Sequence, residues 1–414
     1  MNSQDLRKKF LQFFEKNGHK VVPSSSLVPK NDESVLLTTA GMQQFKPYFT
    51  GQKNVSFDFG STDLTSIQKC FRTSDINLVG DFSHLTFFEM LGNFSIGGYF
   101  KDKAIELMWK FATEALRLPE DKLSATYFEG DAKIPRDDEA KNTWMKFLPE
   151  DKITPAPRED SFWGPTGDEG PCGTSSEFFY QTKTKEKLEV WTLVFMAYYC
   201  DKNGNYKELG LTGVDTGGGI ERMVGVIQGK PSVFETDLFL PIIQSIEQLV
   251  KRNYRKDETT DRRIRIIADH MRASTFLIED GVLPSNKERG YILRRLIRRA
   301  ITHGKLLNEN VGSLKDVAQV VVDEYKNQYP ELENANLEIL VEEETRFKKT
   351  LREGLKKYKE LGQEISGEDA FLLSQSFGFP IELVQELAKE GGKTLDLQDF
   401  EKRLQKHKAV SSLS

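Results

Sequence analysis

The chain has 414 residues and a net charge of −5, with 38% hydrophobic and 29% charged residues. This composition predicts a folded protein of about two to four domains and excludes a disordered chain. No apolar run approaches the roughly 20 residues that cross a bilayer, and the first residues lack the apolar core of a signal peptide. Three cysteines are too few for a disulfide framework or a cysteine-rich zinc site. We therefore expect a cytoplasmic protein that does not bind membranes.

The charge is spread unevenly. Residues 1–250 hold 28 Lys and Arg against 35 Asp and Glu, whereas residues 251–414 hold 30 against 28. The acidic total argues against a protein that coats nucleic acid indiscriminately. Arginines nevertheless cluster in the second part of the chain.

The hydrophobic pattern changes along the chain. Helical periodicity predicts helices over 4–17 and 101–118. Segments rich in β-branched, aromatic and apolar residues predict strands at 35–39, 84–91, 124–129 and 188–200. Further on, helical periods follow one another at 234–253, 262–279, 288–307, 313–328, 336–361 and 380–390. We predict an α+β domain over residues 1–245 and a mostly helical domain over residues 246–414.

A glycine-rich segment carries the first candidate for chemistry. Asp215 precedes the three glycines 217–219, and Arg222 follows them. A helix that begins at Gly219 would present free N–H groups to an anion. A tight turn before a helix explains the glycines equally well, and the spacing does not match a Walker loop.

A second candidate joins Lys69-Cys70-Phe71-Arg72 to His84-Leu85-Thr86-Phe87-Phe88 through polar and small residues. The pattern predicts strand, loop and strand. The Arg and the His could converge on phosphates, and an aromatic ring on the same face could stack a base. From these residues alone, an ordinary hairpin is the stronger interpretation.

Two further segments stand out. Residues 162–173 are dense in Gly and Pro, which predicts a rigid loop of unknown chemistry. Residues 290–301 form a helical period in which apolar side chains fill one half of the wheel and Arg294, Arg295, Arg298 and Arg299 the other. Arg forks match phosphate geometry. We therefore favour contact with nucleic acid or polyphosphate over a merely solvated face.

Taken together, these segments resemble the alanyl-tRNA synthetases, a family of class II aminoacyl-tRNA synthetases, over their catalytic and tRNA-recognition portion. The order and spacing of the matches run from residue 1 to about 410. The matching strings are Ser24-Ser25-Ser26-Leu27-Val28-Pro29, Ala40-Gly41-Met42, Thr86-Phe87-Phe88-Glu89-Met90-Leu91-Gly92-Asn93-Phe94-Ser95, Gly170-Pro171-Cys172-Gly173, Val190-Trp191, Asp215-Thr216-Gly217, Ile267-Ala268-Asp269-His270, Asp280-Gly281-Val282-Leu283-Pro284-Ser285-Asn286 and Phe377-Gly378-Phe379-Pro380.

The resemblance implies an antiparallel sheet flanked by helices, followed by a mostly helical tRNA-recognition domain. It implies that the enzyme joins L-alanine to ATP as alanyl-adenylate and transfers it to the 3′ end of tRNA(Ala). ATP with Mg²⁺ is the implied cofactor, with unknown metal ligands, and no zinc is expected.

The resemblance also implies a role for each matching site residue. Arg72 would hold the α-phosphate, where charge builds as the carboxylate attacks, and Asp215 would pair with the alanine ammonium. Phe88 and Arg222 would enclose adenine, the latter by cation–π stacking. The remaining matches are His84 at the outer phosphates, Trp163, Val190, Trp191 and Gly219 at the nucleotide, and Trp191, Thr192 and Gly217 at the alanine.

The helical domain would recognise the acceptor stem. The family reads a G·U wobble pair with an Asn and an Asp. Asn286 matches the Asn, but Gln375 stands where the Asp is expected. Arg294, Arg295, Arg298 and Arg299 would contact phosphates. A second departure is Thr192, which replaces the family's Asn at the amino acid.

The resemblance ends with the recognition domain, so we expect an enzyme without its own editing domain. We also expect a monomer, with a separate protein that hydrolyses mischarged tRNA. Two alternatives stay open: a paralogue that adenylates an amino acid without charging tRNA, and a non-catalytic tRNA-binding protein.

Overall fold

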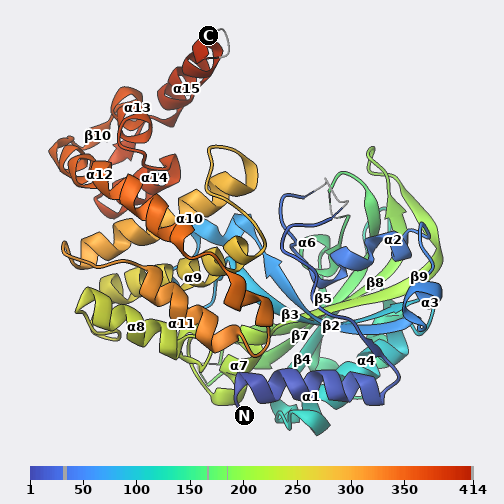
Figure 1. Ribbon diagram of the computed structural model, residues 1–414. Coiled ribbons are helices and arrows are strands. Elements are labelled where there is room, and N and C mark those ends of the chain that lie inside the picture. Colours follow the sequence, from blue (N-terminus) through green and yellow to red (C-terminus); the bar gives the residue numbers. More distant parts are fainter. Residues whose placement is uncertain (31–34, 166, 184, 412–414) are drawn as a thin grey trace. The chain divides into compact units, whose positions relative to one another are not determined.

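The computed structural model describes residues 1–30, 35–165, 167–183 and 185–411, with side chains as far as residue 407 (Figure 1). The chain forms two compact units. Unit 1 comprises Met1–Arg72 and Phe87–Leu240, and unit 2 comprises Thr73–Thr86 and Pro241–Ser414. This division differs from the predicted boundary at residue 245, because the segment Thr73–Thr86 groups with the second unit. Within the described ranges, no helix is long and apolar enough to cross a membrane.

A mostly antiparallel sheet forms the centre of unit 1. Among the described residues it has nine strands, in the order β1-β2-β3-β9-β8-β7-β4-β5 with β6 pairing with β7. The pairs β1–β2 and β4–β5 are parallel, and the others are antiparallel. The strands are β1 (Lys20–Val21), β2 (Asp63–Phe71), β3 (Phe87–Ile96), β4 (Leu123–Phe128), β5 (Ile153–Ala156), β6 (Phe162–Trp163), β7 (Gly170–Gln181), β8 (Lys187–Cys200) and β9 (Tyr206–Gly219).

Helices cover the sheet of unit 1. α1 begins with a capping box made by Asn2 and Asp5, and its buried Phe10 packs 5.6 Å from the Trp191 ring of β8. A second apolar cluster joins Phe45 and Phe49 to Phe94 and Val194. The helices are α1 (Ser3–Lys16), α2 (Lys46–Phe49), α3 (Val55–Phe59), α4 (Lys101–Lys110), α5 (Asp138–Trp144), α6 (Arg158–Ser161) and α7 (Ile220–Gln228).

Unit 2 is mostly helical, and together the two units confirm the predicted α+β fold. α9 and α10 are its central pair, because each buries a long apolar stripe. The elements are α8 (Leu240–Val250), α9 (Glu258–Glu279), α10 (Glu288–Leu307), α11 (Lys315–Tyr325), α12 (Glu338–Glu360), β10 (Glu364–Ile365), α13 (Gly367–Gln375), α14 (Ile381–Glu390), β11 (Thr394–Leu395) and α15 (Leu397–Ser411).

Two predicted elements were wrong. Residues 35–39 form no strand; instead the Thr38 backbone donates to Leu27 and accepts from Phe71. The predicted helix 234–253 shortens to α8, preceded by a 3₁₀ turn at Val233–Glu235. Pattern reading also missed β7 and β9, and it found only the last residues of β2. β2 buries polar side chains that bond to partners distant in sequence, such as Gln68 to Ser25.

Candidate functional site

The register of the central strands brings Asp215, Gly217 and Gly219 onto one face of the sheet in unit 1. On β3, Phe94 lies opposite Asp215 and Met90 opposite Gly219. Strand β8 places Val194 and Thr192 opposite Asp215 and Gly217. Because side chains alternate along a strand and opposed residues share a face, all of these positions line the same surface. We call it the site face.

Asp215 is a buried carboxylate without a counter-ion. Only 6% of the residue is exposed, and neither a hydrogen bond nor an ion pair joins its carboxylate to another side chain in the described part of the chain. Burial raises its pKa to about 7. A charge removed from water without a partner is costly, so this position favours a cationic group brought by a ligand.

Glycine is required beside Asp215. A Cβ on Gly217 would lie 2.7 Å from the Met90 sulfur, and one on Gly218 would lie 2.2 Å from the Trp191 ring. The Gly41 N–H lies 3.3 Å from the same sulfur. The Met90 side chain therefore occupies the position where a side chain at residue 217 would begin, so only glycine fits there.

The Trp191 side chain does not line the site face, which corrects the predicted contact with alanine and ATP. Trp191 is fully buried, and its ring packs 5.6 Å from Phe10 and 6.0 Å from Phe111. It faces α1, on the side of the sheet opposite to that of its neighbour Thr192 on β8. The ring packs directly against Gly218 and so excludes any side chain at that position.

The three glycines end a strand rather than forming a turn. β9 runs to Gly219, and α7 begins at the next residue with Gly219 as its N-cap. The helix start that the sequence predicted is confirmed. Gly219 supplies no side-chain cap to this helix, and a helix N-terminus of this kind favours an anion.

The hairpin of β2 and β3 carries Arg72 and Phe88. Cys70 pairs with Phe88, and Arg72 follows the strand as an exposed residue. The Arg72 guanidinium lies 5.0 Å from the centre of the Phe88 ring, and its Nε donates to the Thr39 carbonyl at 3.4 Å. An exposed cation therefore stands at an aromatic ring beside the site face.

His84 belongs to unit 2, unlike the other predicted nucleotide contacts. Its Nδ1 bonds with the Asp81 carboxylate, and Asp81 also accepts from the His84 backbone at 2.8 Å. The loop between β2 and β3 is thus folded around Asp81.

Arg222, Glu189 and Thr192 form a polar chain across α7 and β8. The Arg222 Nη1 lies 3.0 Å from Glu189 Oε2, and the Thr192 hydroxyl donates to Glu189 Oε1 at 2.9 Å. Burial and the negative charges of Glu189 and Asp160 raise the pKa of Glu177 to about 7, against the lowering charge of Arg222. Sequence reasoning missed both glutamates, because only the pairing of β7 with β8 brings them together.

The other predicted nucleotide contacts border the same region. Val190 is buried on β8 at a bulge, where the register with β7 shifts between Trp191 and Glu189. Trp163, on β6, is partly buried and packs against the cluster that contains Val194. The loop 162–173 thus divides into β6 and the start of β7.

In unit 2, the α10 arginines are not the solvent-facing phosphate surface that the sequence predicted. Arg299 is 3% exposed, and its Nε donates to Glu386 at 2.6 Å. Arg294 and Arg298 share the buried Glu343 at 3.2 and 2.7 Å. Arg295 lies 3.4 Å from Glu382. The acidic partners come from α12 and α14, which the helical wheel of α10 cannot anticipate.

Two of these arginines position predicted tRNA contacts. Arg294 donates through Nη1 to the side-chain oxygen of Asn286, an exposed residue before α10. Arg298 donates through Nη1 to the Gly378 carbonyl at 2.5 Å, in the loop that follows Gln375. Gln375 is exposed at the end of α13.

Comparison with known proteins gives one family. The family model for tRNA synthetases class II (A) matches residues 5–413. The chain is 45% identical to the alanine–tRNA ligase of Borrelia hermsii, covering 99% of this chain and 73% of that protein. It is 44% identical to those of Dehalococcoides mccartyi and of a Thermotoga species, covering 99% of this chain and 49% of each relative. The chain thus spans between about half and three quarters of the length of these relatives.

Proposed function

Because the chain belongs to the class II tRNA synthetases (A), and within them to the alanine–tRNA ligases, we propose that it activates L-alanine with ATP. It then transfers the alanyl group to the 3′ end of tRNA(Ala). The observation that carries the proposal is Asp215, buried and without a counter-ion next to Gly217. The comparisons do not favour a paralogue without tRNA charging or a non-catalytic binding protein.

In this proposal the alanine ammonium pairs with Asp215 and supplies the missing charge. The methyl group packs beside Gly217 against Met90, whose side chain limits the size of the group that fits. Thr192 stays engaged with Glu189, so it orients that carboxylate rather than the amino acid. Positioning of the alanine carboxylate against the α-phosphate supplies most of the catalysis, since no nucleophilic side chain is needed.

ATP would bind beside the same strands. Adenine stacks on Phe88, and the exposed Arg72 turns from that ring to the α-phosphate. There its cation meets the charge that develops in the transition state. The N-terminus of α7 lies on the continuation of β9 and favours anions. Arg222 stays anchored by Glu189 and closes the site at the adenine.

Mg²⁺ fits the pair Glu177 and Glu189. No three His, Cys, Asp or Glu side chains gather as a metal site within the described ranges. Mg²⁺ at ATP, however, needs only one or two carboxylates with phosphates and water. The raised pKa of Glu177 reflects burial beside the negative Glu189, a situation that a cation would relieve. When bound, the ion neutralises phosphate charge.

Two assays test the function. Alanine-dependent exchange of pyrophosphate into ATP measures activation, and transfer of radiolabelled alanine to tRNA(Ala) measures charging. Exchange without charging would favour the paralogue, and the absence of both would refute the proposal.

The remaining partner assignments are part of the proposal. Asn286 and Gln375 would approach the wobble pair, positioned through Arg294 and the Gly378 loop. A monomer in the cytoplasm, and a separate protein that hydrolyses mischarged tRNA, stay predictions. Light scattering at several protein concentrations tests the first of these.

A further inference from the structure

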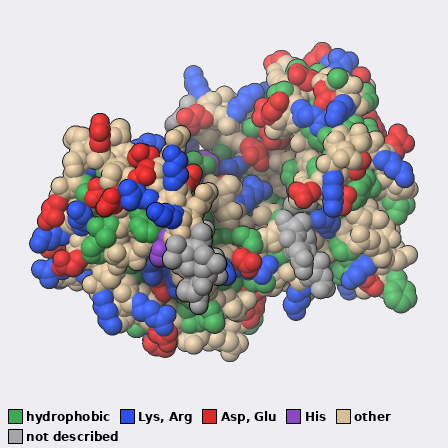
Figure 2. All heavy atoms as spheres, turned by 90° about the horizontal axis from the view of Figure 1, so that it is seen from above, with side chains coloured by type: hydrophobic (Ala, Val, Ile, Leu, Met, Phe, Trp, Pro, Cys, Tyr) green, Lys and Arg blue, Asp and Glu red, His purple; other side chains and the backbone are tan. Residues whose placement is uncertain are grey.

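The internal pairing of the α10 arginines leaves open which cations meet the RNA backbone. Tight binding of a nucleic acid rests largely on Lys and Arg that neutralise phosphates. Basic and acidic side chains are interspersed on the face shown in Figure 2, so no broad basic surface stands out there. The Lys and Arg side chains that contact RNA phosphates should instead form a small exposed group that lacks ion pairs with acidic side chains.

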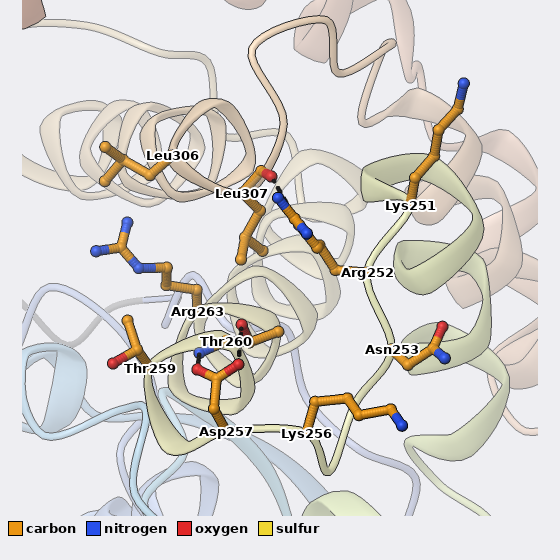
Figure 3. Close-up of a pocket in the computed structure, with 10 residues that line it drawn as sticks. All are labelled: Lys251, Arg252, Asn253, Lys256, Asp257, Thr259, Thr260, Arg263, Leu306 and Leu307. Carbon is orange, nitrogen blue, oxygen red and sulfur yellow. Dashed lines mark hydrogen bonds between the residues drawn. The ribbon is translucent and has the colours of Figure 1, made fainter.

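One pocket in unit 2 meets these conditions. It has a volume of about 610 Å³ and lies between the turn that joins α8 to α9 and the end of α10 (Figure 3). Its lining residues are Lys251, Arg252, Asn253, Lys256, Asp257, Thr259, Thr260, Arg263, Leu306 and Leu307.

Three of the four cations in this pocket form no ion pair with an acidic side chain that the structure describes. Lys251 and Lys256 are exposed, and their ammonium groups make no hydrogen bond or ion pair with any described side chain. The Arg252 guanidinium donates to the Leu307 carbonyl at 3.4 Å. Hydrogen bonds from Thr260 lower the pKa of Asp257, and the Arg252 charge adds only weakly to that effect. Arg263 is held by Glu390 at 3.0 Å.

The single lining carboxylate is already engaged. Asp257 accepts from both the N–H and the hydroxyl of Thr260, each at 2.8 Å, and so caps α9. Figure 3 shows both bonds on one side of the pocket, with Lys256 beside them. The four basic side chains therefore outnumber Asp257, whose carboxylate is bonded to Thr260 of α9.

The turn that presents the lysines is fixed. The Tyr254 N–H donates to Glu247 at 2.6 Å, and the Arg255 N–H donates to Asp261 at 2.7 Å. Lys251 keeps a left-handed backbone, with φ of 55°, a conformation that persists only where its surroundings impose it. A fixed turn lowers the entropic cost of binding.

The chemistry of the lining favours an RNA backbone over a free nucleotide. The ten residues include no aromatic side chain that could stack a base. Lys, Arg, Asn and Thr are the side chains that contact phosphate and sugar, and such contacts fix position without reading sequence.

We propose that this pocket, presented by Lys251, Arg252 and Lys256, binds backbone phosphates of the tRNA. The inference rests on the proposed function for the identity of the RNA. It assigns the phosphate contacts to the α8–α9 turn rather than to the α10 arginines.

The test is the affinity of the full chain for a tRNA(Ala) transcript, measured between 50 and 200 mM KCl for three double variants. The first, K251Q/K256Q, removes two charges. We expect it to raise the Kd about tenfold near 0.1 M salt and to lower the slope of log Kd against log salt by roughly 1 to 2. The second, K251R/K256R, keeps the charges and should restore both values.

The third variant, K349Q/K356Q, is the matched control, since it removes two exposed lysines of α12 that also lack an ion pair with a described residue. It should leave affinity and slope near those of the wild type. Equal effects of K251Q/K256Q and K349Q/K356Q would overturn the inference. So would a loss of affinity without a change in slope.

Two further outcomes separate the possible failures. If K251Q/K256Q loses binding of inorganic tripolyphosphate but keeps its tRNA affinity, the pocket holds a free polyphosphate and the RNA assignment is overturned. If the wild type binds tRNA yet shows no alanine-dependent exchange, the proposed function fails. In that case, the comparison of the variants still shows whether the pocket binds RNA phosphates.

Discussion

Asp215 in unit 1 and Glu343 in unit 2 are buried carboxylates in opposite electrostatic surroundings. In unit 1, Asp215 has no cationic partner among the described side chains, and burial raises its pKa to about 7. In unit 2, Glu343 receives Arg294 and Arg298. Partial burial raises the pKa of Glu386, but the hydrogen bonds from Arg299 and His303 outweigh that effect and hold the pKa far below the usual range. Glu343 and Glu386 are paired with arginines of the same unit. Within the described ranges Asp215 lacks such a partner, so its carboxylate is suited to a cationic ligand.

The largest effect should come from removing the unpaired charge. Asp215→Asn keeps the shape of the side chain and removes the partner of the ammonium. Truncating one member of a buried charge pair costs several kcal/mol, so kcat/KM for alanine should fall by about 10²- to 10³-fold. Alanine-dependent pyrophosphate exchange measures this value.

ATP binding by the same variant is the control and should largely survive. Near-normal exchange in Asp215→Asn would show that the ammonium binds elsewhere. The contrast between the unpaired Asp215 and the paired glutamates would then have no functional meaning.

Breaking a paired charge should instead damage stability. Arg299→Ala removes the hydrogen bonds to Glu386 and to the buried Ile76 carbonyl. Glu386 keeps Arg262 at 2.6 Å and His303 at 3.4 Å, so the loss should cost about 1–3 kcal/mol. Arg346→Ala is the matched control, because its pair with Glu342 is about two-thirds exposed and is worth roughly 0–1 kcal/mol. Urea unfolding midpoints compare the two, and equal midpoints would contradict a structural role for the α10 pairs.

The pH dependence of alanine binding is a smaller effect. Since the pKa of Asp215 lies near 7 in the free protein, the proton must leave before the ammonium can pair. KM for alanine should rise about tenfold per pH unit below 7. The raised pKa also means that Asp215 destabilises the fold progressively as pH rises from about 4 to 7, because the native state holds the proton longer than the unfolded chain.

Glu177 also has a pKa near 7, so a profile alone does not identify the group. Asp215→Asn should flatten the pH dependence of KM, whereas Glu177→Gln should retain it. A profile that persists in Asp215→Asn would assign the titration to Glu177 or to the substrates.

The contrast also explains what the sequence could predict. Periodicity located α10 at its observed bounds, because apolar spacing is a local property. It could not show that Arg299 is buried against Glu386, since that acid lies 87 residues away. The glycines at 217–219 pointed to a close approach, but only strand pairing identified Met90 and Trp191 as the groups approached. Glu177 and Glu189 carried no local signal.

The smallest effect concerns the choice of tRNA, and it compares two residues within unit 2. Asn286 is held by Arg294 through its side-chain oxygen, which leaves its amide hydrogens to donate. Gln375 has only a 3.4 Å bond to the neighbouring Ser374 and stands where the family has an Asp. RNA's minor groove offers the guanine amino group as a donor, and a neutral acceptor binds it about half as strongly as a carboxylate. We therefore expect a weak preference for the wobble pair.

Charging of tRNA(Ala) with G·U, compared with the same tRNA carrying G·C, measures this preference. The wild type should lose roughly tenfold or less with G·C. Gln375→Asp should increase that loss several-fold, because the carboxylate accepts with charge assistance, whereas Gln375→Ala should leave it nearly unchanged. A wild-type loss of several orders of magnitude would mean that the fixed Asn286, or another residue, reads the pair without help from Gln375. The fixed orientation of Asn286 would then matter more for reading the pair than the missing charge at Gln375.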